Sequence, residues 1–93
     1  MKPLTSQKSN TYYTYILECK DGSFYTGIAT NVSRRFKEHK AGKGGNYTRS
    51  HGVTRIVYTE VCKNRSTALK REIEIKRLRR SAKRDLIMGK IVT

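Results

Sequence analysis

Glu72 is the carboxylate that is hardest to explain as ordinary surface. It lies in residues 64–78, whose pattern predicts a helix with an apolar stripe made by Ala68, Leu69, Ile73, Ile75 and Leu78. At roughly 100° per residue, Glu72 falls about 25° from the centre of this stripe, whereas Glu74 falls about 135° away. An inward carboxylate costs stability unless it pairs with a cation or binds a metal. Glu72 is therefore a candidate metal ligand, and a salt bridge to an arginine such as Arg35 is the structural alternative.

Two other pairs of residues carry groups that could do chemistry. Arg35 and His39 stand four residues apart in another predicted helix, so their side chains share one face. Tyr15 and Tyr25 lie in two predicted strands. Taken separately, the first pair also fits a solvated helix face and the second fits aromatics that pack a sheet. Spacing alone leaves both interpretations open.

Positive charge is the dominant feature of the composition. The chain has 93 residues, with 21 Lys and Arg against 7 Asp and Glu, which gives a net charge of +14. The charge is concentrated in residues 34–55 and 63–84, whereas residues 1–33 are nearly neutral. A small domain this basic is expected to bind an anion, and nucleic acid, with DNA favoured, is expected over a membrane surface. The alternative is a cationic surface that serves only solubility.

Several classes of protein are excluded by what the sequence lacks. No apolar run approaches the roughly 18 residues of a membrane span, and the N-terminal residues have no apolar signal region. We therefore expect a cytosolic protein. Cys19 and Cys62 are far apart and show no spacing typical of zinc, so we interpret them as small core residues.

Three strands are predicted from alternating apolar residues. Residues 13–19 form the first, and the Asp21-Gly22 pair indicates a hairpin to a return strand over residues 24–28. Residues 56–62 form the third. If the hairpin loop had two residues, Tyr15 and Tyr25 would lie on opposite faces of the sheet. A site shared by these tyrosines therefore predicts an odd loop or a bulge near residues 20–24.

Three helices complete the predicted fold. The first is capped by Thr30 or Asn31 and runs to about residue 40, the second covers residues 64–78, and a short third covers residues 81–88. Residues 43–46 are expected to form a loop. The prediction is one α+β domain over residues 12–89, with a three-stranded antiparallel sheet flanked by helices in the order β-β-α-β-α-α. Residues 1–11 and 90–93 are expected to be flexible tails.

The order of these residues resembles the GIY-YIG nuclease superfamily. The first motif of that superfamily corresponds to Thr14-Tyr15-Ile16 and the second to Tyr25-Thr26-Gly27, followed by Arg35, His39 and Glu72. The small stand-alone bacterial members are closer still, through residues 15–27, Gly42-Lys43-Gly44, Tyr47-Thr48-Arg49 and Arg71-Glu72. The resemblance covers about residues 12–88 and implies the GIY-YIG endonuclease fold.

The resemblance also implies an activity and a role for each matched residue. The superfamily hydrolyses phosphodiester bonds in DNA with one divalent metal ion, Mg²⁺ or Mn²⁺. Tyr15 and Tyr25 match tyrosines of which one is proposed to help activate water. Arg35 matches an arginine suited to the scissile phosphate, His39 a position suited to a proton relay, and Glu72 the metal ligand. Gly27 would let backbone or phosphate approach closely.

A further group of residues is predicted to contact nucleic acid. It comprises Lys43, Tyr47, Thr48, Arg49, Lys76, Arg79 and Arg80. Residues 46–50 fit a simple loop anchor equally well, and His51 fits an ordinary residue of a polar loop.

The sequence departs from the superfamily pattern in three respects. Thr14 or Tyr13 replaces the glycine of the first motif, no asparagine follows Asn64, and the chain has no room for a separate DNA-targeting domain. The principal hypothesis is a metal-dependent endonuclease acting on DNA. The alternatives are a nucleic-acid-binding module without catalysis and a basic ribosome-associated protein. The sequence does not indicate an oligomeric state.

Overall fold

The computed structural model describes residues 11–89, which form a three-stranded sheet with four helices in this range. The elements, in chain order, are β1 (Tyr12–Cys19), β2 (Phe24–Ala29), α1 (Val32–Lys40), α2 (Asn46–His51), β3 (Val53–Cys62), α3 (Arg65–Lys76) and α4 (Arg80–Ile87). The predicted tails at residues 1–10 and 90–93 lie outside the described residues. No helix within residues 11–89 is long and apolar enough to cross a membrane.

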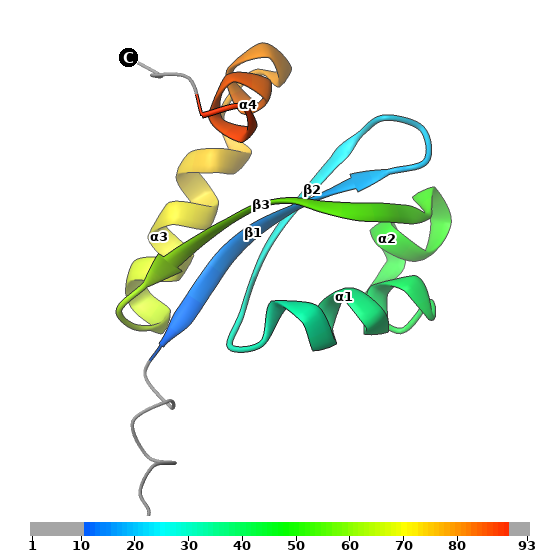
Figure 1. The fold of residues 1–93 in the computed structure, drawn as a ribbon, viewed down its shortest axis with the longest axis horizontal. Coiled ribbons are helices and arrows are strands. Elements are labelled where there is room, and N and C mark those ends of the chain that lie inside the picture. Colours follow the sequence, from blue (N-terminus) through cyan, green and yellow to red (C-terminus); the bar gives the residue numbers. More distant parts are fainter. Residues whose placement is uncertain (1–10, 90–93) are drawn as a thin grey trace, which may run out of the picture.

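The sheet is antiparallel with β1 at its centre, in the order β2-β1-β3. Figure 1 shows α1 and α2 as one group and α3 and α4 as another, with the twisted sheet between them. The four consecutive residues 14–17 of β1 are all buried, because helices cover both faces of this strand. The predicted α+β fold with a three-stranded antiparallel sheet is confirmed.

The β1–β2 hairpin has a loop with an odd number of residues, as a site shared by the two tyrosines requires. Tyr15 pairs with Gly27 and Leu17 pairs with Tyr25, so the two tyrosines lie on the same face of the sheet. The backbone N–H of Gly22 donates to the Cys19 carbonyl at 2.9 Å, and Gly22 adopts a φ of 85° that favours glycine. The predicted irregularity near residues 20–24 is thus confirmed.

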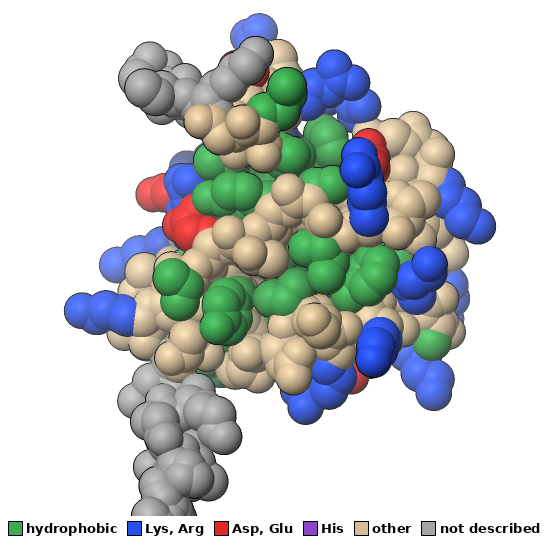
Figure 2. Space-filling model, viewed as in Figure 1, with side chains coloured by type: hydrophobic (Ala, Val, Ile, Leu, Met, Phe, Trp, Pro, Cys, Tyr) green, Lys and Arg blue, Asp and Glu red, His purple; other side chains and the backbone are tan. Residues whose placement is uncertain are grey.

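The two faces of the sheet pack against different helices. On one face, the buried residues Tyr15, Leu17, Cys19 and Val53 pack against partly buried side chains that include Val32 and Phe36 of α1. On the other face, the Thr14 hydroxyl donates to the Ala68 carbonyl of α3 at 3.1 Å. Figure 2 shows hydrophobic side chains across the middle of one side of the molecule, with Lys and Arg mostly towards its margins.

Three helices match the predictions closely. The Asn31 side chain caps α1 by accepting from the Arg34 N–H at 3.0 Å, and Asn64 caps α3 by accepting from the Thr67 N–H at 2.9 Å. The end of α3 at Lys76 falls two residues before the predicted end, and α4 is shifted by one residue from its prediction.

Two features differ from the predictions. Residues 46–51 form α2 rather than a loop, which makes the element order β-β-α-α-β-α-α. This helix has only one buried residue, Thr48, and therefore lacks the apolar stripe that reveals a helix in a sequence. The strand β3 begins at Val53, three residues earlier than predicted, because it continues to pair with β1 past two register shifts.

Candidate active site

The Tyr15 hydroxyl lies at the centre of the candidate site and is bonded to His39. The phenol oxygen is 3.0 Å from His39 Nε2, and both residues are only 1% exposed. The ring crosses over Gly27, where a Cβ atom would lie 2.6 Å from the phenol oxygen. Gly27 was expected to leave room for backbone or phosphate, and here the Tyr15 ring fills that room. Glycine on β2 therefore allows the hydroxyl of a β1 tyrosine to reach α1.

Tyr25 stands beside this pair because of the odd hairpin loop. Its ring centroid is 6.4 Å from that of Tyr15 and 5.1 Å from that of His39. On its other side, the ring of Tyr47 lies 5.9 Å away and is in turn stacked on His51 at 3.9 Å. An aromatic row thus runs from the buried tyrosine to α2.

Arg35 lies one helical turn before His39 on α1. One terminal nitrogen donates to Glu38 Oε1 at 2.8 Å, and the other donates to the Gly44 carbonyl at 3.3 Å. The hydrogen bond to Glu38 raises the pKa of Arg35. The guanidinium is therefore a permanent cation beside the tyrosine, and it has more N–H groups than these two contacts use.

Burial makes both Tyr15 and His39 neutral at physiological pH. Burial raises the pKa of Tyr15 to about 12, the neighbouring Tyr25 and the negative charge of Glu72 add to this rise, and the positive charge of Arg35 opposes it. Burial also lowers the pKa of His39, and the positive charge of Arg35 lowers it further. A neutral phenol therefore meets a neutral imidazole.

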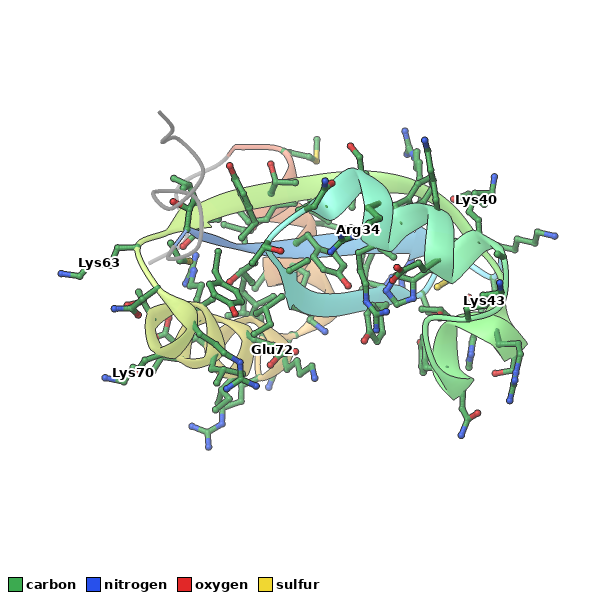
Figure 3. All side chains as sticks on the ribbon, turned by 90° about the horizontal axis from the view of Figure 1, so that it is seen from below. Arg34, Lys40, Lys43, Lys63, Lys70 and Glu72 are labelled. Carbon is green, nitrogen blue, oxygen red and sulfur yellow. The ribbon has the colours of Figure 1, made fainter. Side chains whose placement is uncertain are left out.

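Glu72 faces the sheet, and Glu74 faces solvent, as the sequence predicts. The Glu72 side chain is 18% exposed, and the Glu74 side chain is 64% exposed. In Figure 3, Glu72 lies between α3 and the middle of the sheet, whereas Lys63 and Lys70 extend outward. The partner of Glu72 is Lys76, at 3.3 Å, rather than the arginine that was considered. The negative charge of Glu72 is also the smallest of the causes that raise the pKa of Tyr15.

A metal ion at this site would have Glu72 as its protein ligand. Within residues 11–89, no group of three or more His, Cys, Asp and Glu side chains is placed to hold an ion. A single carboxylate with water and a substrate phosphate is a common arrangement for Mg²⁺, which keeps several of its waters. Because Glu72 is only partly buried and its partner is the flexible Lys76, the donor set fits such an ion.

The predicted nucleic-acid contacts divide into exposed and buried residues. The exposed ones are Lys43, Tyr47, Arg49, Lys76, Arg79 and Arg80. Thr48 differs from the expectation, because its side chain is 2% exposed and its hydroxyl lies 2.8 Å from His39 Nδ1. It therefore stands behind the site instead of on a contact surface.

Gly44 is a residue of the site for which the sequence predicted a loop and a place in the Gly42-Lys43-Gly44 motif, but no role at the site. A Cβ atom at Gly44 would lie 2.0 Å from His39 Nδ1, so the loop backbone is packed directly on the imidazole. Its carbonyl also accepts from Arg35. The pair Gly44-Gly45 was the available signal, since a close approach of backbone to a side chain requires glycine.

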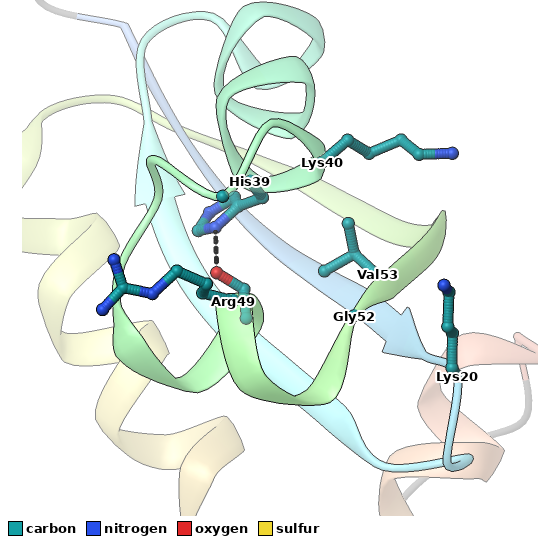
Figure 4. A pocket seen from close by; sticks show the side chains of 8 residues that line it. Lys20, His39, Lys40, Arg49, Gly52 and Val53 are labelled. Atoms are coloured by element: carbon teal, nitrogen blue, oxygen red, sulfur yellow. Dashed lines mark hydrogen bonds between the residues drawn. The ribbon is translucent and has the colours of Figure 1, made fainter.

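A basic hollow of about 280 Å³ lies next to the pair formed by His39 and Thr48 (Figure 4). None of the residues that line it is acidic; they are Lys20, His39, Lys40, Gly42, Thr48, Arg49, Gly52 and Val53. In Figure 4 the side chain of Arg49 lies on one side of the hollow and those of Lys20 and Lys40 on the other. These cations extend the positive surface around the site and do not meet at one point.

Comparison with known proteins gives consistent matches along the chain. Residues 11–85 match the GIY-YIG catalytic domain. UPF0213 protein BH0048 of Halalkalibacterium halodurans is 49% identical over 76 residues, which cover 82% of this chain and 81% of that protein. UPF0213 protein H16_B0156 of Cupriavidus necator is 51% identical over 75 residues, which cover 81% of this chain and 82% of the relative.

Two solution NMR structures resemble the fold. That of UPF0213 protein BH0048 has a TM-score of 0.55 and 48% identity, and the match covers 86% of this chain and 85% of the other. That of protein EF2693 from E. faecalis has a TM-score of 0.58 and 38% identity, and covers 85% of this chain and 84% of the other.

Proposed function

This chain belongs to the GIY-YIG catalytic domain family, and we propose that it is a metal-dependent endonuclease that hydrolyses phosphodiester bonds in DNA. The relationship that the motifs imply is confirmed, and a nuclease-type function follows from the family. The observation that carries the proposal is the Tyr15 hydroxyl, which is bonded to His39 at 3.0 Å and whose pKa responds to the charges of Arg35 and Glu72. The five side chains of the proposed site come from four elements: Tyr15 from β1, Tyr25 from β2, Arg35 and His39 from α1, and Glu72 from α3.

Tyr15 activates the attacking water by passing its own proton onward. With a pKa of about 12, the phenol is almost never ionised at neutral pH and cannot act as a preformed base. His39 is neutral and within hydrogen-bond distance, so it can accept the phenol proton at Nε2 while the phenol oxygen accepts the proton of water. The phenol therefore need not become a free phenolate.

Arg35 binds the scissile phosphate and the charge that develops on it. Its hydrogen bonds to Glu38 and to the Gly44 carbonyl fix the guanidinium, and the remaining N–H groups are available to phosphate oxygens. A guanidinium held in place before the reaction stabilises the transition state without reorganisation.

Glu72 holds the divalent ion, Mg²⁺ or Mn²⁺, in this proposal. When bound, the ion acts as a Lewis acid that neutralises negative charge on the phosphate. The Glu72 carboxylate would hold the ion in place of Lys76, whose side chain is 54% exposed and can move into solvent or towards the nucleic acid.

Five exposed basic residues and Tyr47 hold the nucleic-acid backbone near the site in this proposal. Lys43, Tyr47 and Arg49 lie in the loop before α2 and on α2 itself, and Lys76, Arg79 and Arg80 lie at the end of α3 and the start of α4. With a net charge of +14, binding is expected to weaken steeply as salt rises.

The direct test compares Glu72→Gln with the matched control Glu74→Gln. Purified proteins are incubated with labelled duplex, single-stranded and branched DNA and with RNA, with Mg²⁺, Mn²⁺ or EDTA. We expect wild type and Glu74→Gln to cut DNA only with metal, and Glu72→Gln to be inactive. Cleavage by Glu72→Gln at the wild-type rate, or no cleavage by the wild type in any condition, would contradict the proposal.

A second candidate function is a nucleic-acid-binding module that does not cut. It is favoured by the ion pairs of the site, in which Glu72 contacts Lys76 at 3.3 Å and Arg35 contacts Glu38 at 2.8 Å. In that case the wild type and Glu72→Gln bind DNA or RNA equally, with a steep salt dependence, and neither cuts.

A further inference from the structure

Thr48 closes a chain of buried hydrogen bonds that begins at Tyr15. The phenol oxygen lies 3.0 Å from His39 Nε2, and His39 Nδ1 lies 2.8 Å from Thr48 Oγ1. The three residues are between 1% and 2% exposed, so this chain of hydrogen bonds is shielded from bulk solvent. Thr48 comes from α2, an element that the sequence did not predict.

The geometry points to Thr48 as a positioning residue: we infer that it holds His39 with its proton on Nδ1, which leaves Nε2 free to accept a proton from Tyr15. Its importance for catalysis rests on the proposed function, whereas the position of the proton on His39 does not.

The hydrogen bonds from Tyr15 through His39 to Thr48 can run in two directions, and the number of available acceptors decides between them. With the proton on Nδ1, Tyr15 donates to Nε2, Nδ1 donates to Thr48, and Thr48 donates to the Gly45 carbonyl, which is 3.5 Å from its hydroxyl. In the opposite direction, Thr48 donates to Nδ1 and Nε2 donates to Tyr15. The Tyr15 hydroxyl then has no acceptor among residues 11–89. The first direction gives every donor an acceptor within the protein before any water reaches Tyr15, and a buried donor without an acceptor is costly, so the first direction is favoured.

The surroundings of His39 prevent the ring from turning to escape this arrangement. The Gly44 backbone is packed against Nδ1 so closely that a Cβ atom would lie 2.0 Å away. The Tyr25 ring also meets the imidazole edge-on, with centroids 5.1 Å apart. Thr48 is itself fixed in the first turn of α2, and its β-branched side chain has few rotamers.

The consequence for the proposed reaction is that Thr48 stabilises both states of His39. As the water O–H bond breaks, an O–H bond forms on the phenol, the original phenol O–H bond breaks, and an N–H bond forms on Nε2. The imidazolium then carries protons on both nitrogens, and Nδ1–H still donates to Thr48. Thr48 transfers no proton in this scheme.

The test reads the tautomer of His39 by long-range ¹H–¹⁵N correlation spectra of the full chain at pH 7.5. Wild type, Thr48→Ser and the isosteric Thr48→Val are labelled at histidine, and His39→Gln identifies the His39 signals. We expect an Nδ1–H tautomer in wild type and in Thr48→Ser, and a shift towards the Nε2–H tautomer in Thr48→Val. An Nε2–H tautomer in the wild type overturns the inference without any variant having to fold, and so does an unchanged tautomer in folded Thr48→Val.

Cleavage kinetics provide the second measurement. We expect Thr48→Val to lower kcat about tenfold or more with little change in KM, and Thr48→Ser to restore most of it. An equal loss in both variants would contradict the positioning role. If the tautomer shifts as expected but the wild type cuts nothing, the inference about His39 stands and the proposed function fails.

Discussion

Two polar networks lie on opposite faces of the sheet, one buried and one partly exposed, and each contains a tyrosine hydroxyl. On the α3 face, the Tyr58 hydroxyl donates to Glu60, and Arg71 donates from its Nε to both oxygens of Glu60 at 2.9 and 3.0 Å. Arg71 also donates to Glu74 at 3.2 Å. On the α1 face, the network joins Tyr15 to His39 and Thr48, as described above.

The difference between the two networks is whether ionised side chains take part in the hydrogen bonds: Glu60, Glu74 and Arg71 do so on the α3 face, whereas Tyr15, His39 and Thr48 are neutral. Burial alone would lower the pKa of Arg71, but its hydrogen bonds to Glu60 and Glu74 raise it, so this network is a closed ion cluster. The Tyr15 network is neutral, and beside it Arg35 keeps unused donors. Similar residue types thus make a structural cluster in one place and a candidate site in the other.

The largest effect on DNA cleavage is expected for Arg35, the arginine beside the Tyr15–His39–Thr48 network. Replacing Arg35 with Ala should lower the turnover of DNA cleavage by about 100- to 1,000-fold, because a preorganised phosphate ligand is lost. Lys83→Ala is the control and should alter DNA affinity without altering turnover. Steady-state kinetics and a binding titration measure both. Equal effects of the two substitutions would remove the distinction between site and surface.

The Tyr15–His39–Thr48 network depends on a glycine, Gly44, that packs against His39. In Gly44→Ala, the new Cβ would lie 2.0 Å from His39 Nδ1, so the loop or the imidazole must move. We expect the free energy of unfolding to fall by about 1–3 kcal/mol, as for overpacked cores. Urea unfolding followed by circular dichroism checks this. A variant as stable as wild type would mean that the loop does not hold His39 tightly.

Acid should weaken the neutral network first. The pKa of His39 is lowered in the folded state, so below pH about 6.5 the unfolded chain takes up the proton before the folded one, and stability falls as pH falls. The slope from one such group is at most about 1.4 kcal/mol per pH unit. We expect His39→Gln to flatten the pH dependence of unfolding between pH 7 and 5. A curve as steep as that of wild type, with His51→Gln as the control, would argue against a buried neutral His39.

Breaking the ion cluster of Glu60, Arg71 and Glu74 should lower the stability of the fold without lowering DNA cleavage. Arg71→Met removes the partner of Glu60 and is expected to cost about 1 kcal/mol of unfolding free energy, because both side chains are partly exposed to solvent. Cleavage per folded molecule should stay at the wild-type level. Denaturant unfolding and an activity assay on the same preparation test the two statements together. A loss of activity at full stability would make the α3 face part of the site.

Most of the fold was predictable because it depends on local patterns. The alternation in β1, the asparagine caps of α1 and α3 and the inward position of Glu72 are all visible along the sequence. The helix α2 was missed because Tyr47 and its neighbours are mostly exposed and form no apolar stripe. Local polarity cannot reveal a helix whose buried side, at Thr48, makes a hydrogen bond.

The candidate site was predictable as a set of residues but not as a network. The motifs identify Tyr15, Tyr25, Arg35, His39 and Glu72, and the requirement for one shared face predicts the odd hairpin loop. The partners of these residues depend on tertiary packing. Nothing in the spacing shows that Gly44 packs on His39 or that Lys76 pairs with Glu72.

The most direct test of the account compares the two tyrosine hydroxyls, through DNA cleavage by Tyr15→Phe and Tyr58→Phe with Mg²⁺. Each variant removes one hydroxyl that makes a hydrogen bond to an ionisable partner. We expect Tyr15→Phe to cut at least about 100-fold more slowly than wild type and Tyr58→Phe to cut within about twofold of it. Wild-type cleavage by Tyr15→Phe, or the same loss in both variants, would contradict the assignment of the α1 face as the active site.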